Sequence, residues 1–191
     1  MTPQRDTTPH TILGIDPGTN IMGYGLLRTL HAKAELLDLG VIDLCKMEDP
    51  YHKLGCILQQ LTLLLQAHHP DVMAIESPFC GKNIQSTIKL ARAQGVAIAA
   101  AMQQGVAIAE YAPMKIKMAI TGNGQASKQQ VADMLKRILH IPQQLTPLPD
   151  ATDALAAAYC HHLQLMSPYH NTASHTTWAD FIAHNPHRIK R

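Results

Sequence analysis

Two short apolar runs that each end in a carboxylate constrain this chain more than any other feature of its sequence. The first is residues 11–16 (TILGID), which ends at Asp16, and the second is residues 71–77 (DVMAIES), which carries Glu76 near its end. Continuous apolar runs of this length predict strands that are buried on both faces. Because a charge buried without a partner costs much free energy, carboxylates at the ends of two such strands indicate a functional role.

Strand and helix patterns alternate along the chain and predict an α/β fold. After a turn at residues 17–18, strands at 23–30 and 35–44 complete an opening three-stranded meander. A helix with apolar residues at helical spacing spans 54–68 and is closed by Pro70. The remaining predicted elements are an alanine-rich helix at 81–104, a strand at 106–111, a short helix at 114–121, a helix that begins at Ser127 with Gln130 in a capping box, a proline-containing loop at 143–149 and a last helix at 150–164. The alanines allow close approach of either the sheet or a partner subunit.

A chain of 191 residues predicts a single domain, which we place at 11–166. A disordered leader at 1–10 precedes it, and a polar, histidine-rich tail at 167–191 follows it. The leader has no apolar core, so it is not a secretory signal, and no apolar run approaches the roughly 18 residues of a membrane span. The cysteines form no CxxC pair and predict free thiols in a reducing cytoplasm; they are Cys45, Cys56, Cys80 and Cys160.

Positive charge is concentrated in the middle of the chain. Between residues 82 and 137 there are eight Lys and Arg and two acids, a balance of +6, which leaves −4 for the rest of a chain with net charge +2. A basic middle beside an acidic remainder suits a protein that contacts phosphates in one region and binds cations in another. A solvated helix face that carries lysines is the alternative explanation.

Two further acids, Asp150 and Asp153, lie at the start of the last predicted helix and can share one of its faces. Asp150 has the alternative role of a helix N-cap. Together with Asp16 and Glu76 they would repel one another, and bound cations would relieve that repulsion. Oxygen ligands select Mg²⁺ or Mn²⁺ over zinc, and two such ions about 4 Å apart can stabilise both the attacking and the leaving oxygen of a phosphodiester.

Four motifs follow one another along residues 11–165. They are Gly14-Ile15-Asp16-Pro17-Gly18-Thr19 continuing to Gly23-Tyr24-Gly25, Ala74-Ile75-Glu76 followed by Phe79, Lys82 and Asn83, the run KLARAQGVA at 89–97, and Asp150-Ala151-Thr152-Asp153-Ala154-Leu155-Ala156. Each motif is moderately specific, and the four in this order resemble the RuvC-type Holliday-junction resolvases.

The resemblance implies an RNase H-like fold with a mixed five-stranded sheet and helices on both faces. It also implies a Mg²⁺-dependent crossover junction endodeoxyribonuclease that hydrolyses phosphodiesters of four-way (Holliday) DNA junctions in DNA recombination and repair, without a covalent intermediate. The catalytic acids, which would also be the ligands of two Mg²⁺ ions with Mn²⁺ as a substitute, are then Asp16, Glu76, Asp150 and Asp153. A homodimer that makes two symmetric cuts, and a branch-migration helicase complex as partner, are implied as well.

Four residues are predicted DNA contacts. Phe79 suits stacking on an unpaired base at the crossover, with a place in the core as the alternative. Lys117 and Lys128 match basic positions of the family and suit phosphate binding or stabilisation of developing charge. Lys82 is a further candidate, with a solvated surface position as the alternative. The loop at 121–124 (TGNG) suits a backbone approach to phosphate or a plain turn.

Three other functions share parts of this pattern. The D-x-G-T motif at Asp16 also opens actin-like and sugar-kinase ATPases, which need a second similar domain that this chain lacks. A related RNase H-like nuclease acting on RNA or other branched DNA would share the acids, although Phe79 and the basic middle favour junction DNA. A catalytically silent junction-binding protein is the third alternative, and the presence of all four acids favours an enzyme. The pair His161 and His162 is expected to face solvent or the core.

Overall fold

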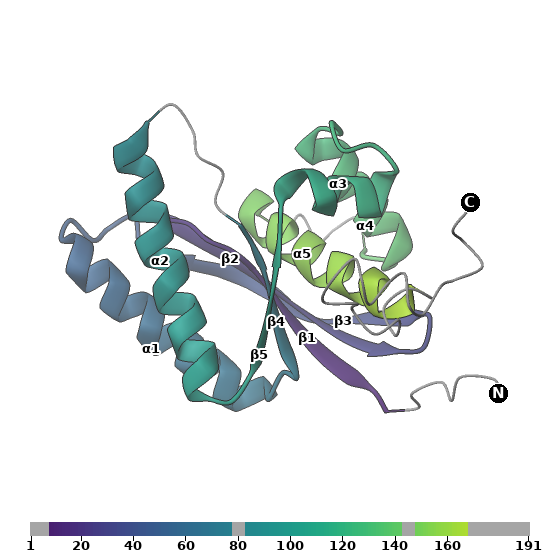
Figure 1. The fold of residues 1–191 in the computed structure, drawn as a ribbon, viewed down its shortest axis with the longest axis horizontal. Helices are drawn as coiled ribbons and strands as arrows, with labels where there is room; N and C mark the ends of the chain where they lie inside the picture. Colours follow the sequence, from purple (N-terminus) through teal and green to yellow (C-terminus); the bar gives the residue numbers. More distant parts are fainter. Residues whose placement is uncertain (1–7, 78–82, 143–147, 168–191) are drawn as a thin grey trace, which may run out of the picture.

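A mixed five-stranded sheet forms the centre of the molecule (Figure 1). The computed structural model describes residues 8–77, 83–142 and 148–167. The elements in chain order are β1 (His10–Asp16), β2 (Ile21–Leu30), β3 (Lys33–Asp43), α1 (Pro50–His68), β4 (Val72–Glu76), α2 (Ile84–Gln103), β5 (Ala107–Tyr111), α3 (Pro113–Thr121), α4 (Lys128–Ile138) and α5 (Pro149–Met166). The strand order is β3-β2-β1-β4-β5; β2 is antiparallel to both β1 and β3, and β4 is parallel to both β1 and β5.

Helices cover both faces of this sheet, as predicted (Figure 1). On one face α1 and α2 bury an apolar layer that includes Leu13, Ile15, Leu26, Ile57, Leu61, Met73 and Ile75. On the other face α5 lies against the sheet, with α3 and α4 packed on it, and this layer includes Ile12, Leu27, Ala74, Ile116, Leu135 and Leu155. The two layers make the central strands buried on both sides, which explains their continuous apolar runs.

The alternation of side chains along the strands assigns the two strand-end acids to one face. In β1, Ile12 belongs to the α5 layer, so Asp16, four residues later, also points toward α5. In β4, Ala74 belongs to the α5 layer, so Glu76 points the same way. Since β1 and β4 are parallel neighbours, both acids lie at the same end of the sheet, where these two strands end.

Capping residues explain where the helices begin. They also explain why the predicted start of α1 was wrong. The helix predicted from residue 54 begins at Pro50, because Asp49 accepts hydrogen bonds from the backbone N–H groups of Tyr51 and His52 at 2.9 and 2.7 Å. It ends at His68, as predicted, and its C-cap His69 lies in the left-handed region with φ of 44°, directly before Pro70.

At the later helices one predicted cap is confirmed and one is wrong. The capping box of Ser127 and Gln130 at the start of α4 is confirmed. The N-cap of α5 is Leu148, and Pro149, which was predicted to be loop, takes the first helical position. Asp150 therefore lies inside the first turn and is not an N-cap.

Only some of the small residues of α2 serve packing within the subunit, since Ala91, Gly95 and Ala99 are exposed. Ala93, Ala97, Ala100 and Ala101 are buried in the layer that α2 shares with α1 and the sheet. No described helix is both long and apolar enough to cross a membrane. Strand β1 begins at His10, the last residue of the predicted leader. Residues 1–7, 78–82, 143–147 and 168–191, including the predicted DNA contacts Phe79 and Lys82, lie outside the described residues.

Candidate active site

Glycines on two strands let α5 lie directly on the sheet. A Cβ atom at Gly14 of β1 would overlap the carbonyl oxygen of Ala154, and one at Gly23 of β2 would overlap the carbonyl group of Asp150. A Cβ atom at Gly25 would lie 2.9 Å from the Cα atom of Leu155. We call these three glycines the glycine groove. Since Gly23 pairs with Asp16 across the β1–β2 ladder, the groove places the start of α5, with Asp150 and Asp153, beside Asp16.

The two strand-end acids have raised pKa values, as expected where several carboxylates lie close together. Burial, followed by repulsion from Glu76 and Asp153, raises the pKa of Asp16 to about 7, with Asp150 adding to the rise. Burial and then repulsion from Asp153 also raise the pKa of Glu76. The four predicted catalytic acids are therefore close enough to affect one another. Buried, repelling carboxylates are common at functional sites.

Two lysines supply positive charge to this cluster. Lys128, the first residue of α4, donates a short hydrogen bond to Asp153, whose side chain is 14% exposed against 70% for Lys128. Burial alone would lower the pKa of Lys128, but the bond to Asp153 and the charges of Asp153 and Asp16 raise it overall. Lys117 of α3 is near enough to lower the pKa of Glu76. The predicted basic residues Lys117 and Lys128 thus lie at the acids.

The donor set fits a hard divalent cation in its chemistry, since every candidate ligand is a carboxylate oxygen. Burial and repulsion raise the pKa of Asp16 and of Glu76 and so disfavour their charged forms, and a bound cation would relieve this cost. In the parts of the chain that are described, no three His, Cys, Asp or Glu side chains are already grouped as a metal-binding cluster. Asp153 instead bonds to Lys128, so full coordination would require this carboxylate to turn from the lysine toward an ion.

The loop after Asp16 is held by one lysine side chain and one backbone hydrogen bond. Lys53 of α1 donates hydrogen bonds to the carbonyl oxygen of Thr19 at 3.2 Å and to Oδ1 of Asn20 at 2.7 Å. The backbone N–H of Leu44 donates to the carbonyl oxygen of Asn20 at 2.8 Å. These contacts fix the chain immediately beyond the strand-end acid.

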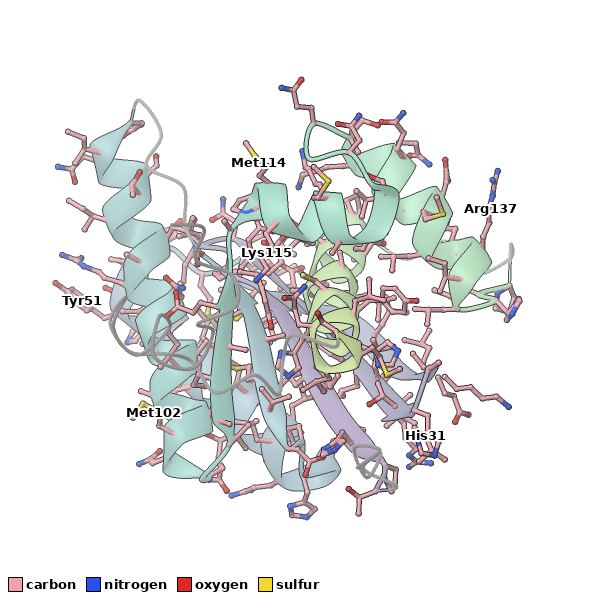
Figure 2. All side chains as sticks on the ribbon, turned by 45° about the vertical axis from the view of Figure 1, so that its right-hand side comes forward. His31, Tyr51, Met102, Met114, Lys115 and Arg137 are labelled. Atoms are coloured by element: carbon pink, nitrogen blue, oxygen red, sulfur yellow. The ribbon has the colours of Figure 1, made fainter. Side chains whose placement is uncertain are left out.

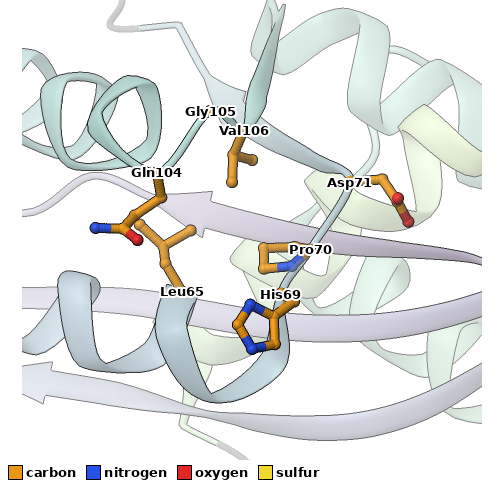
Figure 3. Close-up of a pocket in the computed structure, with 7 residues that line it drawn as sticks. All are labelled: Leu65, His69, Pro70, Asp71, Gln104, Gly105 and Val106. Atoms are coloured by element: carbon orange, nitrogen blue, oxygen red, sulfur yellow. The ribbon is translucent and has the colours of Figure 1, made fainter.

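The four acids are each partly buried. A cavity of about 270 Å³ is lined instead by Leu65, His69, Pro70, Asp71, Gln104, Gly105 and Val106 (Figure 3). These residues precede β4 and β5, whereas Glu76 ends β4, so this cavity is at the opposite end of the sheet.

The structure brings the predicted acids and the two predicted lysines together, but sequence reasoning missed what positions them. The glycines were recognised only as parts of motifs; their signal is that Gly14 and Gly25 are paired across two strands, with Gly23 next to Asp16. His161 and His162 belong to the core, with 8% and 2% exposure.

Comparisons with known proteins identify the family of this chain. A family model described as crossover junction endodeoxyribonuclease RuvC matches residues 12–161. The chain belongs to the RuvC family. The RuvC of Bacteroides fragilis is 56% identical over 180 residues, which cover 94% of this chain and 95% of the relative. The RuvC of Porphyromonas gingivalis is 50% identical over 182 residues, covering 94% and 96%. Family membership identifies the chain as a nuclease, as predicted.

Solved structures extend the comparison to the fold. Thermus thermophilus RuvC in complex with Holliday junction substrate matches with a TM-score of 0.76 and 31% identity, covering 82% of this chain and 95% of that chain. The yeast mitochondrial Holliday junction resolvase Ydc2 matches with a TM-score of 0.63 at 15% identity, covering 84% and 81%, and so shows a common fold alone. The RuvC structures confirm the expected RNase H-like fold.

Proposed function

We propose that this chain resolves four-way (Holliday) DNA junctions by metal-dependent phosphodiester hydrolysis at Asp16, Glu76, Asp150 and Asp153. The observation that carries the proposal is the cluster itself: in a RuvC-family chain, burial and then the charges of the other three acids raise the pKa of Asp16 to about 7. A structure of Thermus thermophilus RuvC holds a Holliday junction substrate, which supports the same substrate class here.

Nucleases of the RuvC family are metal-dependent. We assign two Mg²⁺ ions to the four carboxylates, with Mn²⁺ as a substitute, because the ligands are oxygen only. Bound ions of this kind stabilise charge on phosphate oxygens and lower the pKa of water. Asp16 and Glu76 supply the strand-end ligands, and Asp150 and Asp153 supply those of α5.

The lysines of the site have a separate role in this proposal. Lys128 neutralises Asp153 in the resting protein and can bind a substrate phosphate once Asp153 has turned away. Lys117, near Glu76, binds a second backbone phosphate. Phe79 and Lys82, which lie outside the described residues, are proposed to stack on a base at the crossover and to bind phosphate.

A four-way junction is nearly two-fold symmetric, so a homodimer would present one site to each of two equivalent strands. We propose this assembly, acting with a branch-migration helicase complex in the cytoplasm. The described cysteines Cys45, Cys56 and Cys160 are free thiols, in keeping with a reducing compartment.

The test compares cleavage of a labelled four-way junction with cleavage of a matched linear duplex, with Mg²⁺ present or chelated. The wild type should nick the junction at symmetric positions only when metal is present, and Asp16→Asn should bind the junction without cutting it. Equal cutting of the duplex would indicate a less selective nuclease. Tight junction binding without cleavage by the wild type would indicate a silent binding protein.

A further inference from the structure

A buried hydrogen bond connects β5 with α5. Oη of Tyr111 lies 2.6 Å from Nδ1 of His161, and the two rings are tilted by 57° with centroids 5.9 Å apart. Both side chains are buried, with 7% and 8% exposure. Lys115 of α3, labelled in Figure 2, places its Nζ atom 5.0 Å from the centroid of the Tyr111 ring. Three elements, β5, α5 and α3, therefore meet at this pair.

Tyr111 is also the residue that holds Glu76 within the sheet. The parallel pairing of β1 with β4 ends at Ile15 and Ile75, one residue before the acids. Glu76 is instead paired with Tyr111 of β5, and the N–H of Ser77 donates to the carbonyl oxygen of Tyr111 at 2.9 Å. Paired residues of parallel strands project to the same face, so the Tyr111 ring and the Glu76 carboxylate both face α5.

The glycine groove secures only one half of the contact between α5 and the sheet. Its contacts join Asp150, Ala154 and Leu155 to β1 and β2, and none involves β4 or β5. The bond between Tyr111 and His161 joins the same helix to the other half of the sheet. His161 follows Asp150 by eleven residues, about three helical turns, so both point from nearly the same side of α5.

We propose that Tyr111 and His161 are positioning residues, which set the distance between Glu76 and the two acids of α5. The inference rests on the proposed metal site, because the distance matters only if these carboxylates share ions. The position of Glu76 depends on Tyr111 through the backbone pairing of β4 with β5. The position of Tyr111 relative to α5 depends on the hydrogen bond of its hydroxyl with His161. Burial raises the pKa of Tyr111 to about 12, so the hydroxyl keeps its proton at neutral pH.

The competing explanation is that the pair only satisfies two buried polar groups. Such a role affects only the free energy of unfolding. Removing one partner leaves the other buried without a hydrogen bond, and replacing both partners by apolar residues of similar shape can remove this cost. A positioning role predicts more, because apolar replacement restores folding but not the geometry of the acids. Metal affinity, measured without turnover, distinguishes the two.

The experiment measures Mn²⁺ binding by electron paramagnetic resonance and calorimetry on the full chain, with junction affinity in chelator as a second readout. Tyr111→Phe keeps the ring and its contact with Lys115 but removes the hydroxyl. It should weaken Mn²⁺ binding by about 2- to 10-fold, the range that one hydrogen bond supports, and leave metal-free junction affinity unchanged. The double variant Tyr111→Phe/His161→Leu should show the same weakening with restored stability.

Two further variants complete the design. Tyr159→Phe removes a hydroxyl from an equally buried tyrosine of α5, whose ring contacts His162 at a centroid distance of 5.5 Å, and should leave Mn²⁺ binding unchanged. Asp153→Asn should weaken Mn²⁺ binding strongly if the carboxylates hold the ion. Unchanged Mn²⁺ affinity in both Tyr111 variants, with binding intact in the wild type, would overturn the positioning role alone. No Mn²⁺ binding by the wild type would overturn the metal site and the positioning role with it.

Discussion

Asp16 ends a buried strand, and burial together with the charges of Glu76 and Asp153 raises its pKa to about 7. Its charged form therefore costs folding free energy whenever no cation is bound, in contrast to Asp43. The exposed Asp43 carboxylate accepts a hydrogen bond from the N–H of Cys45 at 2.8 Å, and this bond lowers its pKa. Position within the fold, and not residue type, decides whether a charged carboxylate lowers the stability of the folded state.

Replacing Asp16 by Asn should stabilise the metal-free protein while it abolishes cleavage. A carboxyl group whose folded pKa lies above its unfolded pKa lowers stability as pH rises between the two values. The gain in Asp16→Asn should therefore be small near pH 5 and reach on the order of a few kcal/mol above pH 7. Urea unfolding in chelator at both pH values measures it. A loss of stability in Asp16→Asn at pH 8 would contradict the account, and Asp43→Asn, which should gain nothing, is the control.

Lys128 should matter most when the acids are charged. Lys128→Met removes the partner of Asp153 and the positive charge nearest Asp16. Because the lysine is largely exposed, we expect a loss of only about 1 kcal/mol in unfolding free energy at pH 8 without metal, and less at pH 5. Chemical denaturation at the two pH values tests this, with the exposed Lys89→Met as control. Equal losses at both pH values would show that the lysine stabilises by packing.

Among the elements, α5 has the closest contact with the sheet, and that contact is between backbones. Gly14→Ala should push Ala154 and Ala158 away from β1 and cost about 3 kcal/mol. Gly55→Ala is the matched control, because Gly55 lies inside α1 with open space around it; there the added methyl group should stabilise by roughly 0.5–1 kcal/mol. Urea denaturation of both variants is the measurement. Similar effects at the two glycines would refute the groove.

Much of the element order could be predicted because the signals are local. The apolar runs before Asp16 and Glu76, and the capping box at Ser127, each reflect interactions within a few residues. The early start of α1 depended on Asp49 as a cap, which is also a local signal but one shared with many loop residues. The contact of the glycine groove with α5 could not be predicted, because it joins residues more than 120 positions apart.

The site residues show the same difference between local signals and contacts of distant residues. The four acids and Lys117 and Lys128 could be proposed as site residues from the sequence because their motifs have a recognisable order. The bond between Tyr111 and His161 was missed, since neither residue type nor spacing reveals that a buried histidine faces a tyrosine on a distant strand. Similarly, the ion pair of Lys128 with Asp153 depends on how α4 packs against α5.

At the scale of the whole molecule, pH and metal should act on stability together. Without metal, the melting temperature of the wild type should fall relative to that of Asp16→Asn as pH rises from 5 to 8, because Asp16 has a raised pKa and loses a proton that favours the folded state. The buried His162, whose pKa is lowered by burial, acts in the opposite direction in both proteins. Saturating Mg²⁺ binds only the folded form and should raise the melting temperature of the wild type at pH 8 by about 5–10 °C. Calorimetric scans of both proteins with Mg²⁺ or chelator test this. An equal pH dependence of the two melting temperatures in chelator would contradict it.

The glycine groove has a consequence for how this protein tolerates change. The spacing between Asp16 and the acids of α5 depends on contacts in which a Cβ atom at Gly14 or Gly23 would overlap the backbone of α5. A substitution such as Leu61→Val can loosen the core while it leaves these contacts in place, because Leu61 packs in the α1–α2 layer on the other face of the sheet. Core positions of that layer away from Lys53, which holds the loop after Asp16, are therefore the safer places to introduce stabilising mutations.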